Sequence, residues 1–264
     1  MRIVSLASGS KGNCYYIETN ETSLLVDCGL SLKQTESRLF SIGVDPNKIK
    51  YILVTHEHID HTKGLEVFYN KYKPQIYCNY YSAEKIVNQF KKLDGKITTF
   101  DNEELFLKDI QVSPIVVSHD SVYCTAFKIT KGKAQACILT DLGFVDNNIL
   151  EFVSGSKVVY IESNHDEYML KNCKYPAIVK SRIAGNNGHL SNRQAAFAIL
   201  ALRRLGTTHF VLSHISENSN TYEKAYITIA EILKENGIDI DKDVIIRFAH
   251  QHKPGNNFLL SEDK

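Results

Sequence analysis

The sequence predicts an α/β fold in which β-sheets pack against helices. Short runs rich in β-branched residues alternate with helical patterns along all 264 residues. The early part reads as successive strands joined in hairpins, whereas the later part alternates strand and helix, as in layered β-α folds. No Pro- or Gly-rich linker, internal repeat or low-complexity tract divides the chain. We therefore expect a single domain over residues 1–264.

The elements follow from local patterns, taken in chain order. Strands are expected over 2–7, 14–19, 23–28, 51–56, 75–79, 110–119, 123–130, 134–141, 157–163, 208–214 and 243–248. Helices are expected over 31–42, 63–72, 82–93, 145–153, 191–205 and 221–236. Ser31 and Ser191 each precede a glutamine by three residues. This spacing is the capping-box pattern, which predicts that a helix begins at each serine.

Composition sets modest limits on function. The hydrophobic fraction of 43%, the charged fraction of 23% and the net charge of +1 are those of an ordinary globular protein. Basic pairs such as Lys91-Lys92 are short and scattered, so any surface that binds nucleic acid must be local. The six cysteines form no CxxC pair, which excludes a zinc knuckle and a thioredoxin-like motif. Several lie in apolar runs, and we expect buried, reduced thiols.

Targeting and membrane signals are absent from the sequence pattern. The apolar run near the N-terminus is too short for a signal peptide, and no stretch approaches the roughly 20 apolar residues that span a bilayer. We expect a cytoplasmic protein without a membrane partner. Nothing in the pattern predicts a protein partner.

The segment VTHEHIDHTKG, residues 54–64, is the strongest chemical signal. His56, His58, Asp60 and His61 are metal-ligand types within six positions, directly after an apolar strand. Their spacing differs from the helix-borne HExxH pair. In a loop, however, His56 and His58 can converge on one metal while Asp60 and His61 reach a second. Two such cations can share a bridging water for hydrolysis.

Three further candidates end predicted strands: His119, Asp141 and His214. A buried ionisable side chain is unfavourable unless it is paired or bound to metal. Taken singly, His119 is equally consistent with a core histidine, and Asp141 with a cap of the turn before Gly143. Together with the first motif they complete two ligand sets.

The order of these motifs, with Asp27 ending SLLVD, resembles the metallo-β-lactamase superfamily. The resemblance covers essentially the whole chain and implies a four-layer αβ/βα sandwich. It implies that one metal is bound by His56, His58 and His119 and the other by Asp60, His61 and His214, with Asp141 bridging both. It also implies that Asp27 orients ligands without binding metal. True β-lactamases have cysteine at the Asp141 position, so antibiotic hydrolysis is not expected.

Two downstream segments resemble the RNase Z and phosphodiesterase branch: ESNHD with Glu162, and GHLSN with His189. The resemblance implies that His189 is the general acid for the leaving oxygen, with Glu162 orienting it. Asp60 is expected to be both ligand and catalytic residue. A phosphate could contact the amides at Ser191 or the SGSKGN loop, through Ser10, Lys11 and Gly12. On its own, each of these phosphate sites is a weak pattern.

The combination of SLASGSKGNCYYIE, LLVDCGLS, THEHIDHTKG, SHD, TDLG, ESNHD, GHLSN and LSHISENSN resembles the YycJ/WalJ (VicX) type of exonuclease. That subfamily implies 5′-to-3′ degradation of DNA by a metal-bridging hydroxide, with Mn²⁺ favoured, Zn²⁺ or Fe²⁺ as alternatives, and a link to DNA repair. The chain lacks room for the arm of RNase Z and for the inserted β-CASP domain. Two alternatives stay open: hydrolysis of a small ester, thioester or cyclic nucleotide, and an RNA-directed nuclease. A non-catalytic, metal-stabilised scaffold is a third, although none of the seven expected ligands is missing.

Overall fold

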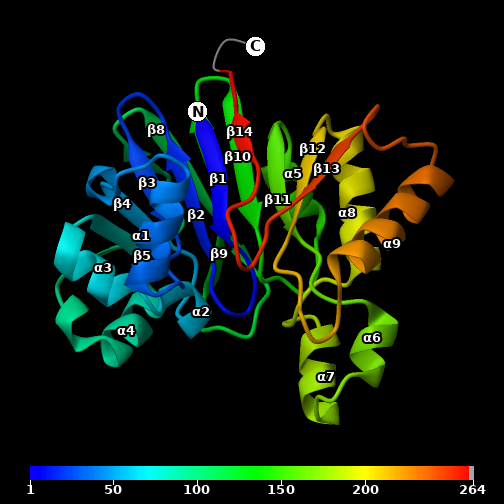
Figure 1. The fold of residues 1–264 in the computed structure, drawn as a ribbon, viewed down its shortest axis with the longest axis horizontal. Coiled ribbons are helices and arrows are strands. Elements are labelled where there is room, and N and C mark those ends of the chain that lie inside the picture. Colours follow the sequence, from blue (N-terminus) through cyan, green and yellow to red (C-terminus); the bar gives the residue numbers. More distant parts are fainter. Residues whose placement is uncertain (262–264) are drawn as a thin grey trace. The chain divides into compact units, whose positions relative to one another are not determined.

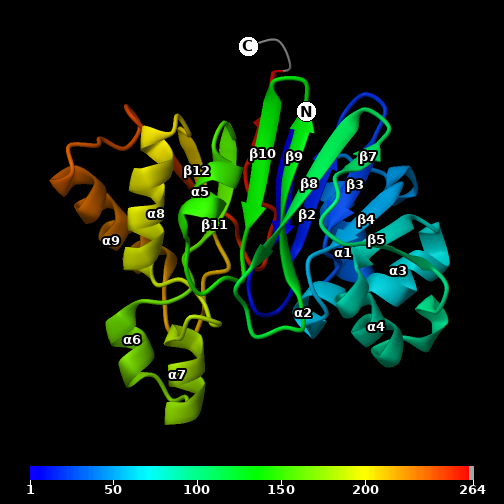
Figure 2. The ribbon, with the colours of Figure 1, turned by 180° about the vertical axis from the view of Figure 1, so that it is seen from behind.

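The computed structural model describes residues 1–261, which form two compact units. The first comprises residues 1–116, 121–134 and 249–261, and the second comprises 117–120 and 135–248. The strands form two seven-stranded sheets, in the orders β14-β1-β2-β3-β4-β5-β6 and β13-β12-β11-β10-β9-β8-β7. Figures 1 and 2 show these strands from opposite sides. The single domain over residues 1–264 stays a prediction.

The first sheet changes from antiparallel to parallel along the chain. Its antiparallel part pairs β2 (Cys14–Glu18) with β1 (Arg2–Ala7) and with β3 (Ser23–Val26), and β1 also pairs with β14 (Asn257–Leu259). Its parallel part adds β4 (Tyr51–Val54), β5 (Gln75–Asn79) and β6 (Ile97–Phe100). The expected order, with hairpins first, is confirmed.

Helices of the first unit cover one face of this sheet (Figure 1). They are α1 (Leu32–Ser41), α2 (Ile59–Thr62), α3 (Leu65–Tyr72) and α4 (Tyr80–Gln89), with 3₁₀ turns η1 (Pro46–Lys48) and η2 (Lys91–Leu93). Leu39 of α1, Phe68 of α3 and Ile86 of α4 are fully buried in one core cluster with Ile52 and Val54 of β4. Ile52 and Val54 are two residues apart and so point to the same face. The unit also contains β7 (Leu105–Leu107), β9 (Cys124–Lys131) and all of β8 (Ile110–Val117) but its last residue.

The second unit is built on parallel strands. These are β10 (Ala134–Leu139, whose first residue belongs to the first unit), β11 (Val158–Glu162), β12 (His209–Ser213) and β13 (Ile245–Phe248), each paired in parallel with the next. Helices α5 (Asn147–Val153), α6 (Glu167–Asn172), α7 (Ala177–Ala184), α8 (Asn192–Arg204) and α9 (Tyr222–Glu235) form the connections. Parallel neighbours bring their carboxyl ends to one edge, where polar residues collect.

Strand ends differ from the expectation at three predicted site residues. We expected strands to continue through Asp27, Asp141 and His214, but β3, β10 and β12 end one or two residues earlier. These three residues have positive φ angles of 62°, 61° and 53°. The left-handed conformation is uncommon for residues other than glycine and turns the chain out of the sheet.

Other local expectations are confirmed or extended. The capping boxes at Ser31 and Ser191 are both present. The six cysteines are free thiols, five of them buried and Cys173 half-buried. Over residues 1–261, none of the helices combines the length and the apolar character needed to cross a bilayer. Within residues 1–261, six helices and strands were not expected, α2, α6, α7, β6, β7 and β14, and neither was the 3₁₀ turn η1.

Candidate metal and catalytic residues

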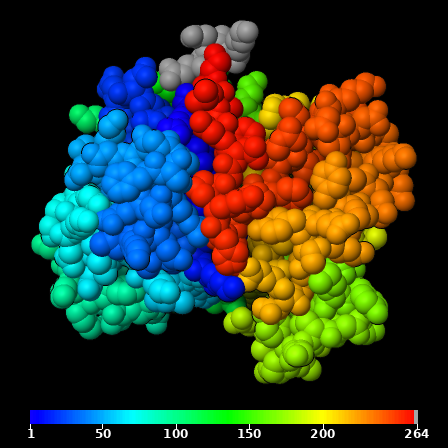
Figure 3. Space-filling model, viewed as in Figure 1, coloured from blue at the N-terminus to red at the C-terminus, as the bar shows by residue number. Residues whose placement is uncertain are grey.

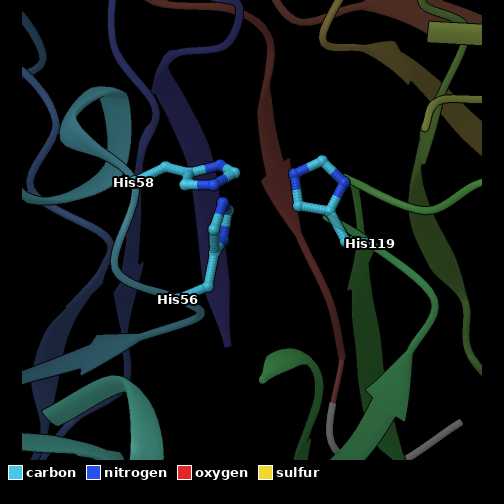
Figure 4. Close-up of side chains that lie close together, drawn as sticks. All are labelled: His56, His58 and His119. Atoms are coloured by element: carbon cyan, nitrogen blue, oxygen red, sulfur yellow. The ribbon is translucent and has the colours of Figure 1, made fainter. Parts of the chain in front are cut away.

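The predicted ligands of the first unit lie directly after β4. His56 and His61 are fully buried, and their ring centroids are 4.1 Å apart. The His58 ring lies edge-on to His56, with centroids 4.6 Å apart and planes at 75°. Figure 4 shows the His56 and His58 side chains, together with His119, which belongs to the second unit. Within the first unit, therefore, the motif brings three imidazoles together.

Asp27 holds one of these imidazoles in place. Its carboxylate accepts hydrogen bonds from the Thr55 amide at 2.8 Å and the Thr55 hydroxyl at 3.0 Å. It also lies 2.7 Å from Nδ1 of His61. Burial raises the pKa of Asp27, and the neighbouring His61 and Thr55 oppose that rise. A carboxylate on Nδ1 fixes the ring so that Nε2 is the nitrogen for a metal, which is the role that the resemblance implies for Asp27.

The SGSKGN loop between β1 and β2 contacts the ligand motif through a residue that the sequence patterns did not single out. The amide of Asn13 donates to the carbonyl of Asp60 at 2.7 Å. Its Nδ2 lies 2.9 Å from Nε2 of His61 and 3.3 Å from Oδ2 of Asp60. Ser10 and Lys11, the predicted phosphate contacts, are exposed, and Gly12 has a positive φ of 153°. The loop is therefore placed beside the motif, but the phosphate role stays a prediction.

Glu57, between the two histidines of the motif, is a second residue that the sequence patterns did not single out. Its side chain is buried, with Oε1 accepting from the Val122 amide at 2.8 Å and Oε2 from the Ser82 hydroxyl at 3.0 Å. Ser82 also donates to the Tyr123 carbonyl. Glu57 thus ties the ligand loop to α4 and to the segment before β9. The HxHxDH pattern itself gives no signal for this role.

In the second unit, four predicted site residues meet at the carboxyl ends of the parallel strands. Ligand atoms of Asp141, Glu162, His189 and His214 all lie within 4.8 Å of one another. Oε1 of Glu162 lies 2.8 Å from Nδ1 of His189 and 2.7 Å from Nδ1 of His214. Nδ1 of His214 is also 3.2 Å from Oδ1 of Asp141. Oε1 of Glu162 therefore orients the imidazoles of both His189 and His214.

The second oxygen of Glu162 is held by the backbone. Oε2 accepts from the amides of Leu142 and Leu190, both at 3.2 Å. Burial alone would raise the pKa of Glu162, but the two imidazoles hold that pKa well below its usual range. Burial likewise opposes protonation of His189, but the Glu162 carboxylate raises the His189 pKa overall. Glu162 is therefore an anion that favours a protonated His189.

His119 is held by the loop that carries His189. Its Nδ1 lies 3.2 Å from the Gly188 carbonyl, and its Nε2 lies 3.3 Å from Oδ1 of Asp120 and 3.9 Å from Oδ1 of Asp141. Burial lowers the His119 pKa, which favours the neutral imidazole that binds metal. Within the second unit, His119 therefore lies next to Asp141, as we expect if both bind metal.

Three buried asparagines join the segments that carry Glu162, His189 and His214. Asn220 Nδ2 donates to Oδ1 of Asn192 at 2.8 Å and to the Ser163 carbonyl at 2.9 Å. Asn164 Nδ2 donates to the His214 carbonyl at 2.9 Å, and its amide donates to the Leu190 carbonyl. These residues belong to the motifs ESNHD, GHLSN and LSHISENSN. Sequence reasoning used those motifs without assigning the asparagines a role.

Ser191 is used by its own helix. Its hydroxyl accepts from the Gln194 amide at 3.2 Å, and its amide donates to Oε1 of Gln194 at 2.8 Å. The hydroxyl also donates to Oε1 of Glu167. These bonds give Ser191 a capping role, and its predicted contact with phosphate stays a prediction.

The donor chemistry of each unit fits divalent cations. Imidazole and carboxylate together suit Zn²⁺, Mn²⁺ or Fe²⁺. In both units a carboxylate lies on Nδ1 of a histidine, Asp27 on His61 and Glu162 on His214, which is how proteins orient metal-binding imidazoles. The complete set of seven ligands, drawn from both units, stays a prediction.

Comparison with known proteins places the chain in a family. Residues 22–215 match the model of the β-lactamase superfamily domain. The chain is 36% identical over 242 residues to "Exodeoxyribonuclease YycJ" of Bacillus anthracis, covering 89% of this chain and 90% of that protein. It is 34% identical over 249 residues to "Exodeoxyribonuclease WalJ" of Streptococcus pneumoniae, covering 90% of each.

Solved structures confirm the fold. The metallo-β-lactamase fold protein YhfI of Bacillus subtilis aligns over 98% of this chain and 99% of its own, with a TM-score of 0.71 at 16% identity. The short form of human tRNase Z aligns over 96% of this chain and 98% of its own, with a TM-score of 0.66 at 16% identity. The predicted fold class is therefore confirmed, and the chain belongs to the β-lactamase superfamily domain family and, within it, to the family of YycJ and WalJ.

Proposed function

We propose that this protein is a dinuclear-metal phosphodiesterase that degrades DNA as a 5′-to-3′ exonuclease in the cytoplasm. The observation that carries the proposal is the cluster of Asp141, Glu162, His189 and His214, in which one glutamate orients two imidazoles beside an aspartate. Two curated relatives that match over about nine-tenths of the chain are named exodeoxyribonucleases. Together these favour a DNA phosphodiester over the small ester, thioester or cyclic nucleotide of the alternative hypothesis.

In this proposal His56, His58 and His119 would hold one metal, Asp60, His61 and His214 would hold the other, and Asp141 would serve both. Bound cations would activate the attacking water and neutralise charge on the phosphoryl oxygens. Mn²⁺ is the favoured ion, with Zn²⁺ and Fe²⁺ as alternatives. Asp27 and Glu162 keep the Nδ1 atoms of His61 and His214 engaged, so that their rings present Nε2.

His189 supplies the proton that the leaving oxygen needs. Nδ1 of His189 is held by Glu162 at 2.8 Å, so the transferable proton is on Nε2. An expelled sugar alkoxide is a poor leaving group. Protonation by a positioned acid increases the rate of such a reaction by about 10²- to 10⁴-fold. Glu162 favours the protonated ring and keeps it oriented.

The first test is metal-dependent degradation of a 5′-phosphorylated DNA duplex. Protein stripped of metal and reloaded with Mn²⁺, Zn²⁺ or Fe²⁺ should release nucleotides from the 5′ end, seen as early release of a 5′ label and late release of a 3′ label. Asp60→Ala should abolish release, and the surface control Asp94→Ala should not. Equal activity of wild type and Asp60→Ala would overturn the proposal. Faster cleavage of the matched RNA would point to the RNA-directed alternative.

A second test isolates the proton donor. His189→Ala should lower kcat on DNA by about 10²-fold or more, but have much less effect on bis-p-nitrophenyl phosphate, whose nitrophenolate leaves without protonation. The ratio of the two losses is the readout. Equal losses on both substrates would mean that His189 does not protonate the leaving oxygen.

A further inference from the structure

The segment that joins Tyr168 to Gly188 has an unusual charge balance. In a chain with net charge +1, residues 168–188 contain four cationic side chains and no carboxylate. The cations are Lys171, Lys174, Lys180 and Arg182. The nearest acidic residues in sequence, Asp166 and Glu167, hydrogen-bond to the Met169 amide at 2.9 Å and to the Ser191 hydroxyl, and Arg182 is paired with Asp120 at 3.1 Å. The segment is the local basic surface that composition alone could not locate.

Large apolar and aromatic side chains lie among these cations. Tyr168 is 76% exposed on α6, and Ile178 is 79% exposed on α7. Tyr168 and Lys171 are three residues apart and share one side of α6, while Ile178 and Arg182 are four apart and share one side of α7. Figures 1 and 2 show the two helices side by side at one end of the second unit, and Figure 3 shows their surface as an exposed lobe. We call Tyr168, Lys171, Lys174, Ile178 and Arg182 the α6–α7 surface.

This surface is directly connected to the predicted general acid. The His189 amide donates to the Ile183 carbonyl at 2.9 Å, at the end of α7. A Cβ on Gly188 would lie 2.2 Å from the carbonyls of Arg182 and Ile183, so the turn from α7 to His189 is closely packed. Arg182 lies 3.1 Å from Asp120, the neighbour of His119. α7 therefore contacts the segments that carry His119 and His189 directly.

We propose that the α6–α7 surface binds a single strand of the nucleic-acid substrate, with lysines on phosphates and Tyr168 against a base. The inference rests on the proposed nuclease function and adds the place where the polymer lies. Proteins that bind single strands combine a basic surface that follows the backbone with aromatic side chains on which bases stack. Residues 168–188 provide both, next to the residue assigned to the leaving oxygen.

The test uses full-length, Mn²⁺-loaded protein and separates binding of the polymer from chemistry. Lys171→Glu/Lys174→Glu should raise the KM for a 5′-phosphorylated single-stranded DNA by about 10-fold and leave kcat within twofold, because the charges act on phosphates. The dependence of KM on salt should become shallower. Hydrolysis of bis-p-nitrophenyl phosphate should not change. The matched control is Lys234→Glu/Lys242→Glu, two exposed lysines elsewhere in the second unit.

Stacking is tested at Tyr168. Tyr168→Ala should weaken binding of fluorescein-labelled DNA in an anisotropy titration, and Tyr168→Phe should retain it, because the ring face and not the hydroxyl makes the contact. Equal effects of the α6–α7 and control lysine pairs, or parallel loss on the small diester, would overturn the proposal. So would unchanged DNA binding with lost binding to anionic vesicles, which would identify a membrane surface instead.

The two proposals fail separately. If wild-type protein hydrolyses the small diester but no DNA, the exonuclease function fails, and the anisotropy titration still decides whether the α6–α7 surface binds a strand. If DNA is degraded and the Lys171 and Lys174 reversals have no effect beyond that of the control pair, only the α6–α7 proposal fails.

Discussion

The two units use the same backbone device for different purposes. In the first, Asp27 follows β3 with a φ of 62°, and Gly29 comes two residues later. In the second, Asp141 follows β10 with a φ of 61°, and Gly143 comes two residues later. In each case a backbone carbonyl leaves no room for a Cβ. A Cβ on Gly29 would lie 1.6 Å from the carbonyl oxygen of Asp60, and a Cβ on Gly143 would lie 2.0 Å from that of Asn186. Strand, left-handed aspartate and tightly packed glycine therefore occur twice.

The difference lies in what each aspartate contacts. Asp27 is fully buried, and its carboxylate binds Thr55 and Nδ1 of His61. Asp141 instead lies among the imidazoles of His119, His189 and His214. The same turn thus directs one carboxylate to orient a ligand and the other to the predicted metal. Backbone geometry sets where a carboxylate points, and its neighbours decide whether it binds metal.

The largest expected effect separates these two roles. Asp141→Asn should abolish hydrolysis at any metal concentration, because the proposed shared ligand loses its negative charge. Asp27→Asn should lower metal affinity by about 10- to 100-fold, and excess Mn²⁺ should restore much of kcat. The comparison is made by measuring kcat of both variants as the Mn²⁺ concentration is raised. If excess metal rescues the two alike, the distinction between ligand and orienting residue is wrong.

A second prediction concerns the glycines. Gly29→Ala and Gly143→Ala should each lower the free energy of unfolding by about 3 kcal/mol or more, since backbone must shift to admit a Cβ, and both should reduce bound metal. Gly43→Ala is the control: its φ is +77° with nothing within 4 Å of the added Cβ, so only about 1 kcal/mol of backbone strain is expected. Chemical denaturation and metal analysis provide the readouts. Losses no larger than that of Gly43→Ala would contradict the packing argument.

The third prediction tests a feature of the second unit alone. Asn220→Ala leaves buried partners of Asn192 and Ser163 unsatisfied, which costs about 1–3 kcal/mol. Since the network joins the segments of Glu162, His189 and His214, kcat on DNA should fall as well. The exposed Asn88→Ala should be within about 0.5 kcal/mol of wild type. A fully active Asn220→Ala protein would show that the asparagine network does not contribute to catalysis.

The smallest effect belongs to the first unit and depends on pH. Burial would raise the pKa of Asp109, but hydrogen bonds from Lys131, Thr22 and Thr19 lower it to about 2. A depressed folded-state pKa stabilises the fold above the unfolded value of about 3.9 and loses that contribution as pH falls through 2. Asp109→Asn should therefore be less stable than wild type at pH 7, and the gap should close between pH 4 and 2. A gap that is constant with pH would show that the effect is not electrostatic.

Much of the fold was predictable because periodicity and caps are local. The strands over 51–54 and 158–162 and the helices that start at Ser31 and Ser191 follow from nearby residues. By contrast, α6 has only six residues, and α7 has no clear apolar face, with only Ile183 fully packed. β6, β7 and β14 have three or four residues each. Such segments form because tertiary partners complete them, and a local pattern does not contain that information.

The candidate site divides in a similar way. His56, His58, Asp60 and His61 were identifiable because they are adjacent in sequence, and Glu162 and His189 because of a family resemblance. Asn13, Glu57 and Asn220 were not identified, because each acts through a hydrogen bond to a distant segment. The left-handed conformations of Asp27, Asp141 and His214 were also unpredictable, since strand propensity favours continuation through them.

The connection from β11 to β12 has a consequence for how this protein can diversify. β11 and β12 are adjacent and pair in parallel from Val158 with His209 to Glu162 with Ser213. Helices α6 and α7 lie within that connection, and substitutions of their exposed residues leave the pairing of the two strands intact. If the α6–α7 surface binds the substrate strand as proposed, exchanging its exposed residues between relatives should change the preferred polymer and leave the reaction centre in place.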